Sequence, residues 1–168
     1  IEHIAWDFDA AGICYFNHTR NRLNESVRRR RGFLGPEIVI CLRNEQQVIF
    51  NGMRGLCLTI GPADENARAE AEIYFPDHGV RVTAKLQLQQ FGKRKIESLE
   101  TFPWAKGSWD TLGLLFDYGY VLTCHKSQGS QWRTVVLQPE ASYRDTMETR
   151  ARWNYTAVSR ASERLVIV

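Results

Sequence analysis

The sequence has no apolar run long enough to cross a membrane, because a spanning helix needs roughly 20 consecutive apolar residues. Its first residues, Ile1-Glu2-His3, form neither the basic start nor the apolar stretch of a secretory signal. We therefore expect no membrane partner. The chain also begins without methionine, and we expect it to be part of a longer polypeptide.

Cysteine pairs at metal-binding spacing are missing too. The four cysteines (Cys14, Cys41, Cys57 and Cys124) contain no C-x-x-C pair, and the four histidines do not cluster with them. Three of the four lie in apolar stretches, which is typical of buried, reduced thiols. We expect no metal site, no disulfide and a reducing, intracellular location.

The sequence also lacks the signals that hold a nucleotide and its metal. It has no G-x-x-x-x-G-K-[ST] phosphate loop, since Gly92-Lys93 is followed by Arg94 and no glycine stands at the required distance before it. Asp64-Glu65 follows Gly61-Pro62-Ala63 rather than the apolar strand that would present a magnesium ligand. No carboxylates cluster at the spacing of a nuclease centre. The chain alone therefore supplies neither a phosphate cradle nor magnesium ligands.

What is present is the composition of a folded domain. Of 168 residues, 43% are hydrophobic and 24% are charged, with 12 glycines and 5 prolines. The net charge is only +3, but six arginines fall between Arg20 and Arg31 against the single Glu25, and Lys93-Arg94-Lys95 forms a second basic group. Such local groups are typical either of a polyanion-binding face or of solvated helix ends.

The hydrophobic pattern predicts an α/β sheet interrupted by a β module. Residues 13–16 predict a strand, residues from 19 to the arginine run a helix, and residues 37–43 a second strand, giving β-α-β. Alternation at 69–75 and 80–86, around Pro76-Asp77-His78-Gly79, predicts a hairpin with a four-residue turn inside a small antiparallel barrel.

After the barrel the pattern returns to short apolar strands. Runs at 118–123 and 134–137 predict buried parallel strands, and residues 165–168 a last strand. Between them, Asp145 and Glu148 are spaced almost as a capping box, so a helix is expected to begin at Asp145. Its apolar stripe would be made of Met147, Ala151, Tyr155 and Val158.

Two segments carry the residues most suited to chemistry. Thr123-Cys124-His125-Lys126-Ser127-Gln128-Gly129-Ser130-Gln131 follows a predicted buried strand, where ligands bind in open α/β sheets. Arg160 and Arg164 are spaced i, i+4 near the end of the last predicted helix, and an arginine held there can stabilise charge on a transferred phosphate. Each feature alone also has a structural explanation, as a loop cap or as a cation at a helix C-terminus.

Together, these segments resemble a family. Thr-x-His-Lys-Ser-Gln-Gly-Ser followed by Tyr-Thr-Ala-Val-Ser-Arg-Ala-x-Glu-Arg-Leu is similar to motifs V and VI of superfamily 1 DNA helicases, most closely the RecD-like and Dda-like branch. Tyr15-Phe16-Asn17-His18-Thr19-Arg20-x-x-Leu23-Asn24 resembles motif IV. The resemblance implies a RecA-like second motor domain of residues 1–51 and 113–168, interrupted by an SH3-like barrel of residues 52–112.

The resemblance also implies roles for individual residues. Arg160 would be the catalytic arginine finger at the ATP γ-phosphate, and Arg20, Gly129 and Gln131 would contact the nucleotide. Relatives of the UvrD type carry glutamate where this chain has Gln131. Single-stranded DNA would be bound by the remaining motif residues, which are Asn17, Thr123, His125, Lys126, Ser127, Gln128 and Ser159. Trp104, Trp109, Trp132 and Trp153 could stack bases or simply pack.

On this basis the chain is expected to be the C-terminal segment of an ATP-dependent DNA helicase in a bacterial or phage-infected cytoplasm. ATP and Mg²⁺ would bind only in the complete protein, in a cleft shared with an N-terminal RecA-like domain that carries the Walker motifs. A RecD-like identity, as in an exodeoxyribonuclease V alpha subunit, would add nuclease–helicase partners and a role in DNA repair or recombination. The alternative is a non-catalytic nucleic-acid or protein-binding module on a RecA-like scaffold.

Overall fold

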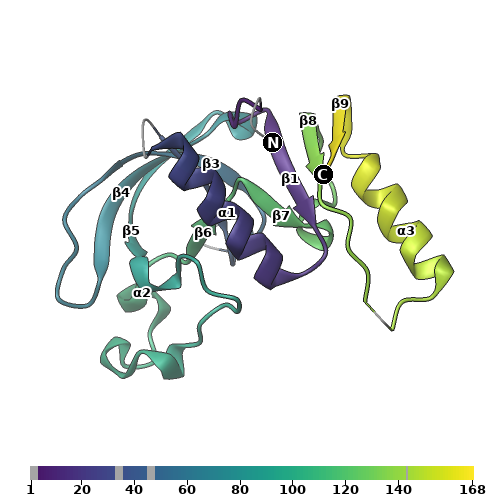
Figure 1. Cartoon of the computed structure of the whole chain (residues 1–168). Helices are drawn as coiled ribbons and strands as arrows, with labels where there is room; N and C mark the ends of the chain where they lie inside the picture. The colour runs from purple at the N-terminus through teal and green to yellow at the C-terminus, as the bar shows by residue number, and fades with distance from the viewer. Residues whose placement is uncertain (1–3, 33–35, 45–47, 143) are drawn as a thin grey trace. The chain divides into compact units, whose positions relative to one another are not determined.

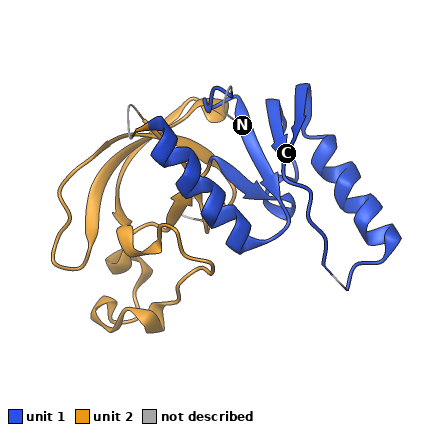
Figure 2. Ribbon diagram, viewed as in Figure 1, with its two compact units in different colours: residues 1–31, 120–168 blue, residues 32–119 orange. Residues whose placement is uncertain are grey.

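The computed structural model describes residues 4–32, 36–44, 48–142 and 144–168. The chain divides into two compact units, coloured separately in Figure 2. Unit 1 joins Ile1–Arg31 to Tyr120–Val168, and unit 2 is the intervening Gly32–Gly119. The predicted α/β domain with an inserted β module is therefore confirmed, although the inserted unit is longer than the predicted residues 52–112.

Unit 1 is built on a four-stranded parallel sheet. Its strands are β1 (Ala10–Cys14), β7 (Val121–Thr123), β8 (Trp132–Leu137) and β9 (Ala161–Ile167), in the order β7-β1-β8-β9 (Figure 1). All three pairings are parallel. The carboxyl ends of the strands therefore lie together at one end of the sheet, here called the carboxyl edge, and their amino ends lie together at the other, the amino edge. The side chains of β1 are completely buried, as expected for an inner strand of a parallel sheet.

The helix α1 (Asn17–Arg31) packs on β1 and β7. Asn24, on its buried side, donates a hydrogen bond from Nδ2 to the carbonyl of Val121 and accepts one at Oδ1 from the amide of the same residue, both 2.9 Å long. The Asn24 side chain thereby bonds the outer side of β7 in the way that the backbone of a neighbouring strand would. The helix ends in four consecutive arginines, followed by Gly32 at φ 66°.

The helix α3 (Met147–Val158) packs against β8, β9 and the 3₁₀ turn η5 (Cys124–Ser127). Two details of its prediction are wrong. The N-cap is Thr146, whose Oγ1 accepts a hydrogen bond from the Thr149 amide, whereas Asp145 binds elsewhere. The predicted stripe faces outward, with Met147 89% and Tyr155 77% exposed, because Trp153 and Ala157 make the contact with the sheet.

Unit 2 contains a five-stranded antiparallel sheet in the order β5-β4-β3-β2-β6. The strands are β2 (Glu37–Cys41), β3 (Arg54–Ile60), β4 (Arg68–Phe75), β5 (Val80–Gln87) and β6 (Phe116–Tyr118). The predicted hairpin is confirmed, since β4 and β5 pair from Arg68–Gln87 to Phe75–Val80 around the turn η1 (Pro76–His78). Gly79 ends this turn at φ 63°, a conformation that favours glycine.

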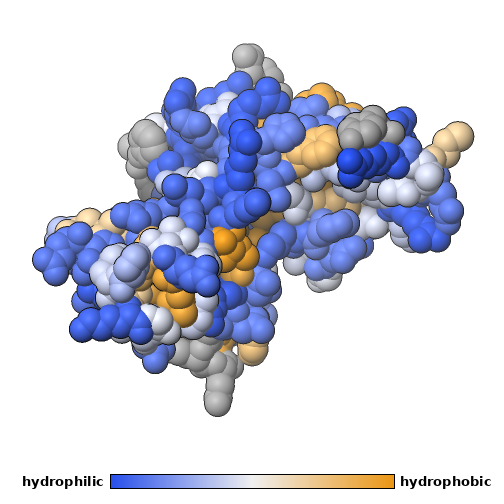
Figure 3. All heavy atoms as spheres, turned by 90° about the horizontal axis from the view of Figure 1, so that it is seen from below, coloured by the Kyte–Doolittle hydropathy of each residue, from blue (hydrophilic) through white to orange (hydrophobic). Residues whose placement is uncertain are grey.

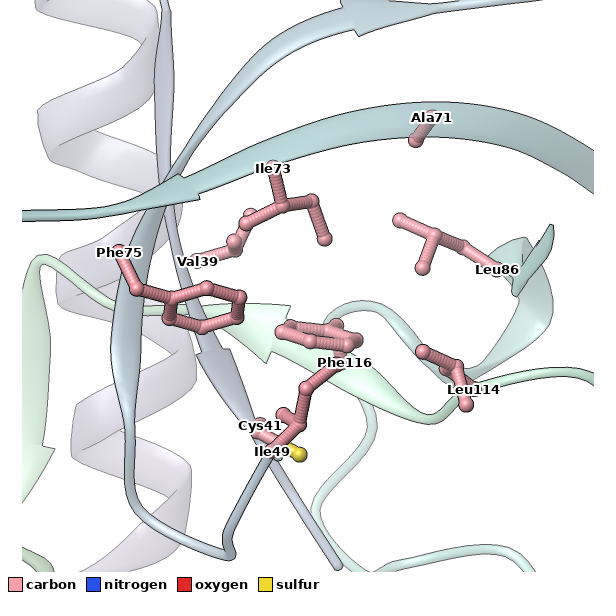
Figure 4. Packing of buried hydrophobic residues seen from close by; sticks show 9 residues of the cluster. All are labelled: Val39, Cys41, Ile49, Ala71, Ile73, Phe75, Leu86, Leu114 and Phe116. Atoms are coloured by element: carbon pink, nitrogen blue, oxygen red, sulfur yellow. The ribbon is translucent and has the colours of Figure 1, made fainter. Parts of the chain in front are cut away.

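The sheet of unit 2 curls until its two outer strands, β5 and β6, approach each other. Leu114, just before β6, donates to the Lys85 carbonyl over 2.8 Å and accepts from the Gln87 amide over 3.0 Å. Gly113 allows this approach, because a Cβ there would lie 2.8 Å from the Lys85 carbonyl oxygen. Figure 4 shows the enclosed core, in which the Phe75 and Phe116 rings lie 6.4 Å apart. The predicted barrel-like module is thus confirmed.

Between β5 and β6 the chain forms short helical turns. They are η2 (Leu88–Gln90), η3 (Leu99–Thr101), η4 (Pro103–Ala105) and α2 (Trp109–Leu112). The two tryptophans here have partners within unit 2: the Arg43 guanidinium lies 3.6 Å from the Trp109 ring centre, and Phe102 packs edge-on against Trp104. Both therefore take part in packing.

The predicted β-α-β unit at the start of the chain is wrong. The strand at 37–41 forms, but as β2 it pairs antiparallel with β3 and β6 in the sheet of unit 2. Likewise, the predicted strand 118–123 is divided between β6 and β7. The chain bends at Gly119, whose amide donates to the Ile38 carbonyl and whose missing Cβ would lie 2.9 Å from Val39.

Hydrophilic residues dominate the surface seen in Figure 3, where hydrophobic ones appear as scattered patches. Within the described residues, no helix has both the length and the apolar character needed to cross a membrane. The same residues contain no group of three side chains placed to hold a metal ion. All four cysteines are free, and Cys14, Cys41 and Cys124 are buried.

Candidate functional site

The carboxyl edge of the parallel sheet collects three of the residues predicted to bind DNA. Asn17 begins α1 directly after β1, and Thr123 and His125 lie at the end of β7 and the start of η5. They line a pocket of about 140 Å³ whose wall is completed by Tyr15, Cys124 and Trp153. Asn17 and His125 are exposed, so their polar groups are accessible to a ligand.

Glu140 holds the turn between β1 and α1 in place. One of its carboxylate oxygens, Oε2, accepts from the backbone amides of Tyr15 at 2.9 Å and Phe16 at 3.2 Å, and Oε1 accepts from the Thr19 hydroxyl. An anion near the first turn of a helix also interacts favourably with the helix dipole. The loop after β8 thereby fixes the backbone that presents Asn17.

The rest of the motif after β7 is less open than predicted. Ser127 is fully buried, and its hydroxyl donates to the Cys124 carbonyl over 2.7 Å, which closes the η5 turn. Lys126 is half-buried and Gln128 is exposed. Of these three predicted DNA ligands, Ser127 therefore stabilises the loop and is not exposed on its surface.

Arg160 lies at the opposite, amino edge of the sheet. It stands between α3 and β9, and its carbonyl accepts from the Trp132 amide at the start of β8. Its guanidinium donates three hydrogen bonds: Nε to the Thr156 carbonyl at 3.0 Å, Nη1 to the Ser130 carbonyl at 3.2 Å and Nη2 to the Ser159 hydroxyl at 2.9 Å. The helix predicted to carry Arg160 ends at Val158, so Arg160 lies in the turn before β9, where these three bonds hold its side chain.

Gln131 and Ser159 join Arg160 at this edge. Gln131 donates from Nε2 to the Ser159 carbonyl over 3.3 Å, and Gly129, at φ 84° and exposed, lies two residues before it. The structure therefore brings together the predicted nucleotide residues Gly129, Gln131 and Arg160 from two distant motifs. It also places Ser159, predicted to bind DNA, beside Arg160 instead of with Asn17 and His125.

Arg20 is not part of this cluster. It lies in the first turns of α1, near the carboxyl edge, is 7% exposed, and donates from Nη2 to the Asn21 side chain over 2.7 Å. Arg20 follows β1 along the chain, whereas Arg160 precedes β9. The predicted contact of both arginines with one nucleotide stays a prediction.

The thiols of Cys14 and Cys124 are buried next to the carboxyl edge. Burial, reinforced by the charge of Glu140, raises the pKa of Cys14 to about 12, and burial also raises the pKa of Cys124. The pKa of Tyr15 is raised because its hydroxyl donates a 2.8 Å hydrogen bond to Asp145 Oδ1. The thiols stay protonated at neutral pH and are not nucleophiles.

Three residues at the carboxyl edge were not predicted to have a role there: Tyr15, Glu140 and Asp145. Tyr15 was counted within a strand, but β1 ends at Cys14, so its ring turns to the edge, where it packs 5.7 Å from Trp153. The aromatic pair Tyr15-Phe16 directly before Asn17 was the sequence feature that could have indicated a role for Tyr15 at this edge. For Glu140 and Asp145 there was no such signal, since the bonds that link them to Tyr15 join residues more than a hundred positions apart in the sequence.

Comparison with known proteins finds a family match for the C-terminal part of the chain. Residues 118–168, which contain η5, α3 and Arg160, match the family model of the UvrD-like helicase C-terminal domain. A search of curated protein sequences finds no match.

Solved structures share the fold of the whole chain. The Pif1 helicase from Bacteroides in complex with ADP-AlF3 and ssDNA has a TM-score of 0.60 at 14% identity over 98% of this chain and 41% of that one. The Candida albicans Pif1 helicase has a TM-score of 0.57 at 14% identity over 96% and 45% of the two chains. The chain thus spans less than half the length of these helicases.

The fold and the two clusters define a RecA-like domain with a barrel-like insertion. Its C-terminal segment is similar to a UvrD-like helicase C-terminal domain, and its fold is that of the Pif1 structures.

Proposed function

We propose that this chain is the second motor domain of an ATP-dependent DNA helicase. Arg160 acts as the arginine finger on an ATP molecule whose phosphates and Mg²⁺ are held by an N-terminal Walker domain, and Gln131 and Gly129 contact the same nucleotide. The observation that carries the proposal is the convergence of Arg160, Gln131 and Gly129 at one sheet edge from two separate motifs.

The carboxyl edge binds the DNA strand. Asn17, Thr123 and His125 contact its sugar–phosphate backbone, which positions a strand without reading its sequence. Lys126 adds positive charge, and Gln128 a further donor. This part of the proposal is supported by the shared pocket of Asn17, Thr123 and His125, and by the ssDNA in the Bacteroides Pif1 complex, a protein of the same fold.

The finer identity follows from the motifs. We place the protein in the RecD-like and Dda-like branch, acting in the cytoplasm. A RecD-like protein would work in a nuclease–helicase assembly in DNA repair or recombination, with the nuclease on another subunit.

A hydrolysis assay tests the proposal. The 168-residue chain should show no ATP turnover, with or without single-stranded DNA, whereas the longer protein that contains it should show turnover stimulated by DNA. Turnover by the chain alone would overturn the proposal, because the chain would then contain a complete ATP site. In the alternative, a non-catalytic scaffold, the longer protein would bind DNA with the same affinity whether or not an ATP analogue is present.

A further inference from the structure

A second pocket lies beside the Asn17–His125 pocket, and the two share the Tyr15 and Trp153 side chains as a common wall. Its volume is about 300 Å³, at the lower end of the range for small-molecule sites. It opens at the same carboxyl edge, between the loop after β8 and α3. Its main lining side chains are Tyr15, Glu140, Asp145, Arg150, Trp153 and Asn154.

The two carboxylates of this pocket are already used by the fold. Asp145 accepts from the Tyr15 hydroxyl at Oδ1 and from the Ser142 amide at Oδ2, and Glu140 accepts at both of its oxygens. These bonds fix the Tyr15 ring against Trp153. The aromatic wall is therefore oriented before any ligand arrives.

Two polar side chains of the pocket are unused. Arg150 and Asn154 are exposed, stand i, i+4 on α3, and so project from the same face of the helix. Neither side chain has a hydrogen bond or an ion pair within the parts of the chain that the structure describes. By contrast Arg152, on another face of α3, is paired with Glu148 at 2.6 Å.

We propose that this pocket binds one nucleobase of the DNA strand, together with its phosphate. The base stacks on the Tyr15–Trp153 wall, Asn154 hydrogen-bonds the base edge, and the Arg150 guanidinium pairs with the adjacent phosphate. This inference rests on the proposed function and extends it, because it adds a base subsite next to the backbone contacts of Asn17, Thr123 and His125.

The lining favours a base over a free anion or a metal ion. Glu140 and Asp145 would repel a phosphate in the interior of the pocket, so Arg150 can serve only a phosphate at its rim. A metal ion would need carboxylate oxygens that are instead occupied by backbone amides and hydroxyls. A flat, neutral base is not repelled by the two carboxylates and needs no oxygen ligand from them. Every base also has a face that can stack.

Binding of this chain to a fluorescent oligothymidylate, measured by anisotropy at several salt concentrations, tests the phosphate contact. Arg150→Ala should weaken binding and lower the slope of log Kd against log salt by about 0.7, the value for one phosphate contact on a single strand. The matched control Arg152→Ala removes the same charge from the same helix and should leave the slope unchanged. Both side chains are exposed, so neither variant should unfold the protein.

The base contact is tested with an oligonucleotide of equal length and charge that has abasic sites. Wild type should bind it roughly tenfold more weakly than oligothymidylate, as expected for the loss of one stacked base. Tyr15→Phe, which keeps the ring, should retain most of this discrimination. Tyr15→Ala and Asn154→Ala should reduce it, with circular dichroism verifying that each variant is folded.

The outcomes separate this inference from the proposed function. If wild type binds DNA but Arg150→Ala and Arg152→Ala have equal slopes and the abasic strand binds as well as oligothymidylate, the base subsite is wrong and the backbone contacts stand. If wild type binds neither strand, both the subsite and the DNA-binding part of the proposed function are overturned.

Discussion

Charged side chains have different surroundings at the two edges of the parallel sheet. At the carboxyl edge Glu140 is bound to backbone amides, and the pockets beside it are open. At the amino edge the Arg160 guanidinium is itself bound, to two carbonyls and one hydroxyl. The carboxyl edge thus has open pockets, whereas the Arg160 guanidinium uses three of its five N–H donors within the protein and keeps two for a ligand.

This difference matches the division of labour that we propose. In our proposal, DNA binding needs only groups that the chain already presents, whereas nucleotide hydrolysis needs phosphates that another domain holds against Arg160. Each of the following predictions tests one side of this comparison.

The largest effect is expected for Arg160→Ala in the longer protein. Loss of an arginine finger removes charge stabilisation from the transition state, so kcat for ATP hydrolysis should fall by about 10³ or more. Arg164→Ala, an exposed arginine on β9, is the matched control and should change kcat by less than about threefold. Equal effects of the two substitutions would show that the amino edge has no special role.

Asn24→Ala should destabilise the chain by about 3 kcal/mol. Asn24 is 2% exposed, and its removal leaves both the amide and the carbonyl of Val121 without their partner inside the protein. Urea unfolding followed by circular dichroism measures the change, and the exposed Arg22→Ala on the same helix should cost less than about 0.5 kcal/mol. If Asn24→Ala leaves the free energy of unfolding unchanged, the position of β7 does not depend on its hydrogen bonds with Asn24.

Alkaline pH should weaken the fold through Cys14. Its pKa is raised from 9.0 to about 12, so the protonated thiol stabilises the folded state below pH 9, and this stability is lost as pH rises toward 12. By pH 10 the loss is about 1.4 kcal/mol. Unfolding curves at pH 8 and pH 10 should therefore differ more for wild type than for Cys14→Ala. An identical pH dependence would place the thiol in contact with water.

The smallest effect is expected for Tyr155→Ala. Tyr155 is 77% exposed and lies on the outward face of α3. The free energy of unfolding should change by no more than about 0.5 kcal/mol in urea titrations. A loss above 2 kcal/mol would instead support the apolar stripe predicted from the sequence.

The local structure was largely predictable because it depends on neighbouring residues. The hairpin at 68–87 follows from strict alternation and a proline–glycine turn, and the motifs after β7 and at the end of α3 are continuous segments. The strand at 37–41 was also expected, but its short apolar run, residues 38–41, does not specify the sheet, and β2 joined unit 2.

Long-range contacts were not predictable. The orientation of α3 is determined by Trp153 and Ala157, and the sequence stripe of Met147, Ala151 and Tyr155 was equally regular but faces outward. Similarly, the hydrogen bond from Gln131 to the Ser159 carbonyl joins two motifs that lie 28 residues apart in the sequence. Only the register of distant strands decides which motif residues meet.

Hydrogen–deuterium exchange of the 168-residue chain with and without oligothymidylate tests the separation of the two edges most directly. Amides at 15–18 and 123–126 should exchange more slowly when DNA is bound, while those at 129–131 and 159–161 should be unchanged. Protection confined to 129–131 and 159–161 would place the DNA on the Arg160 edge and contradict the account.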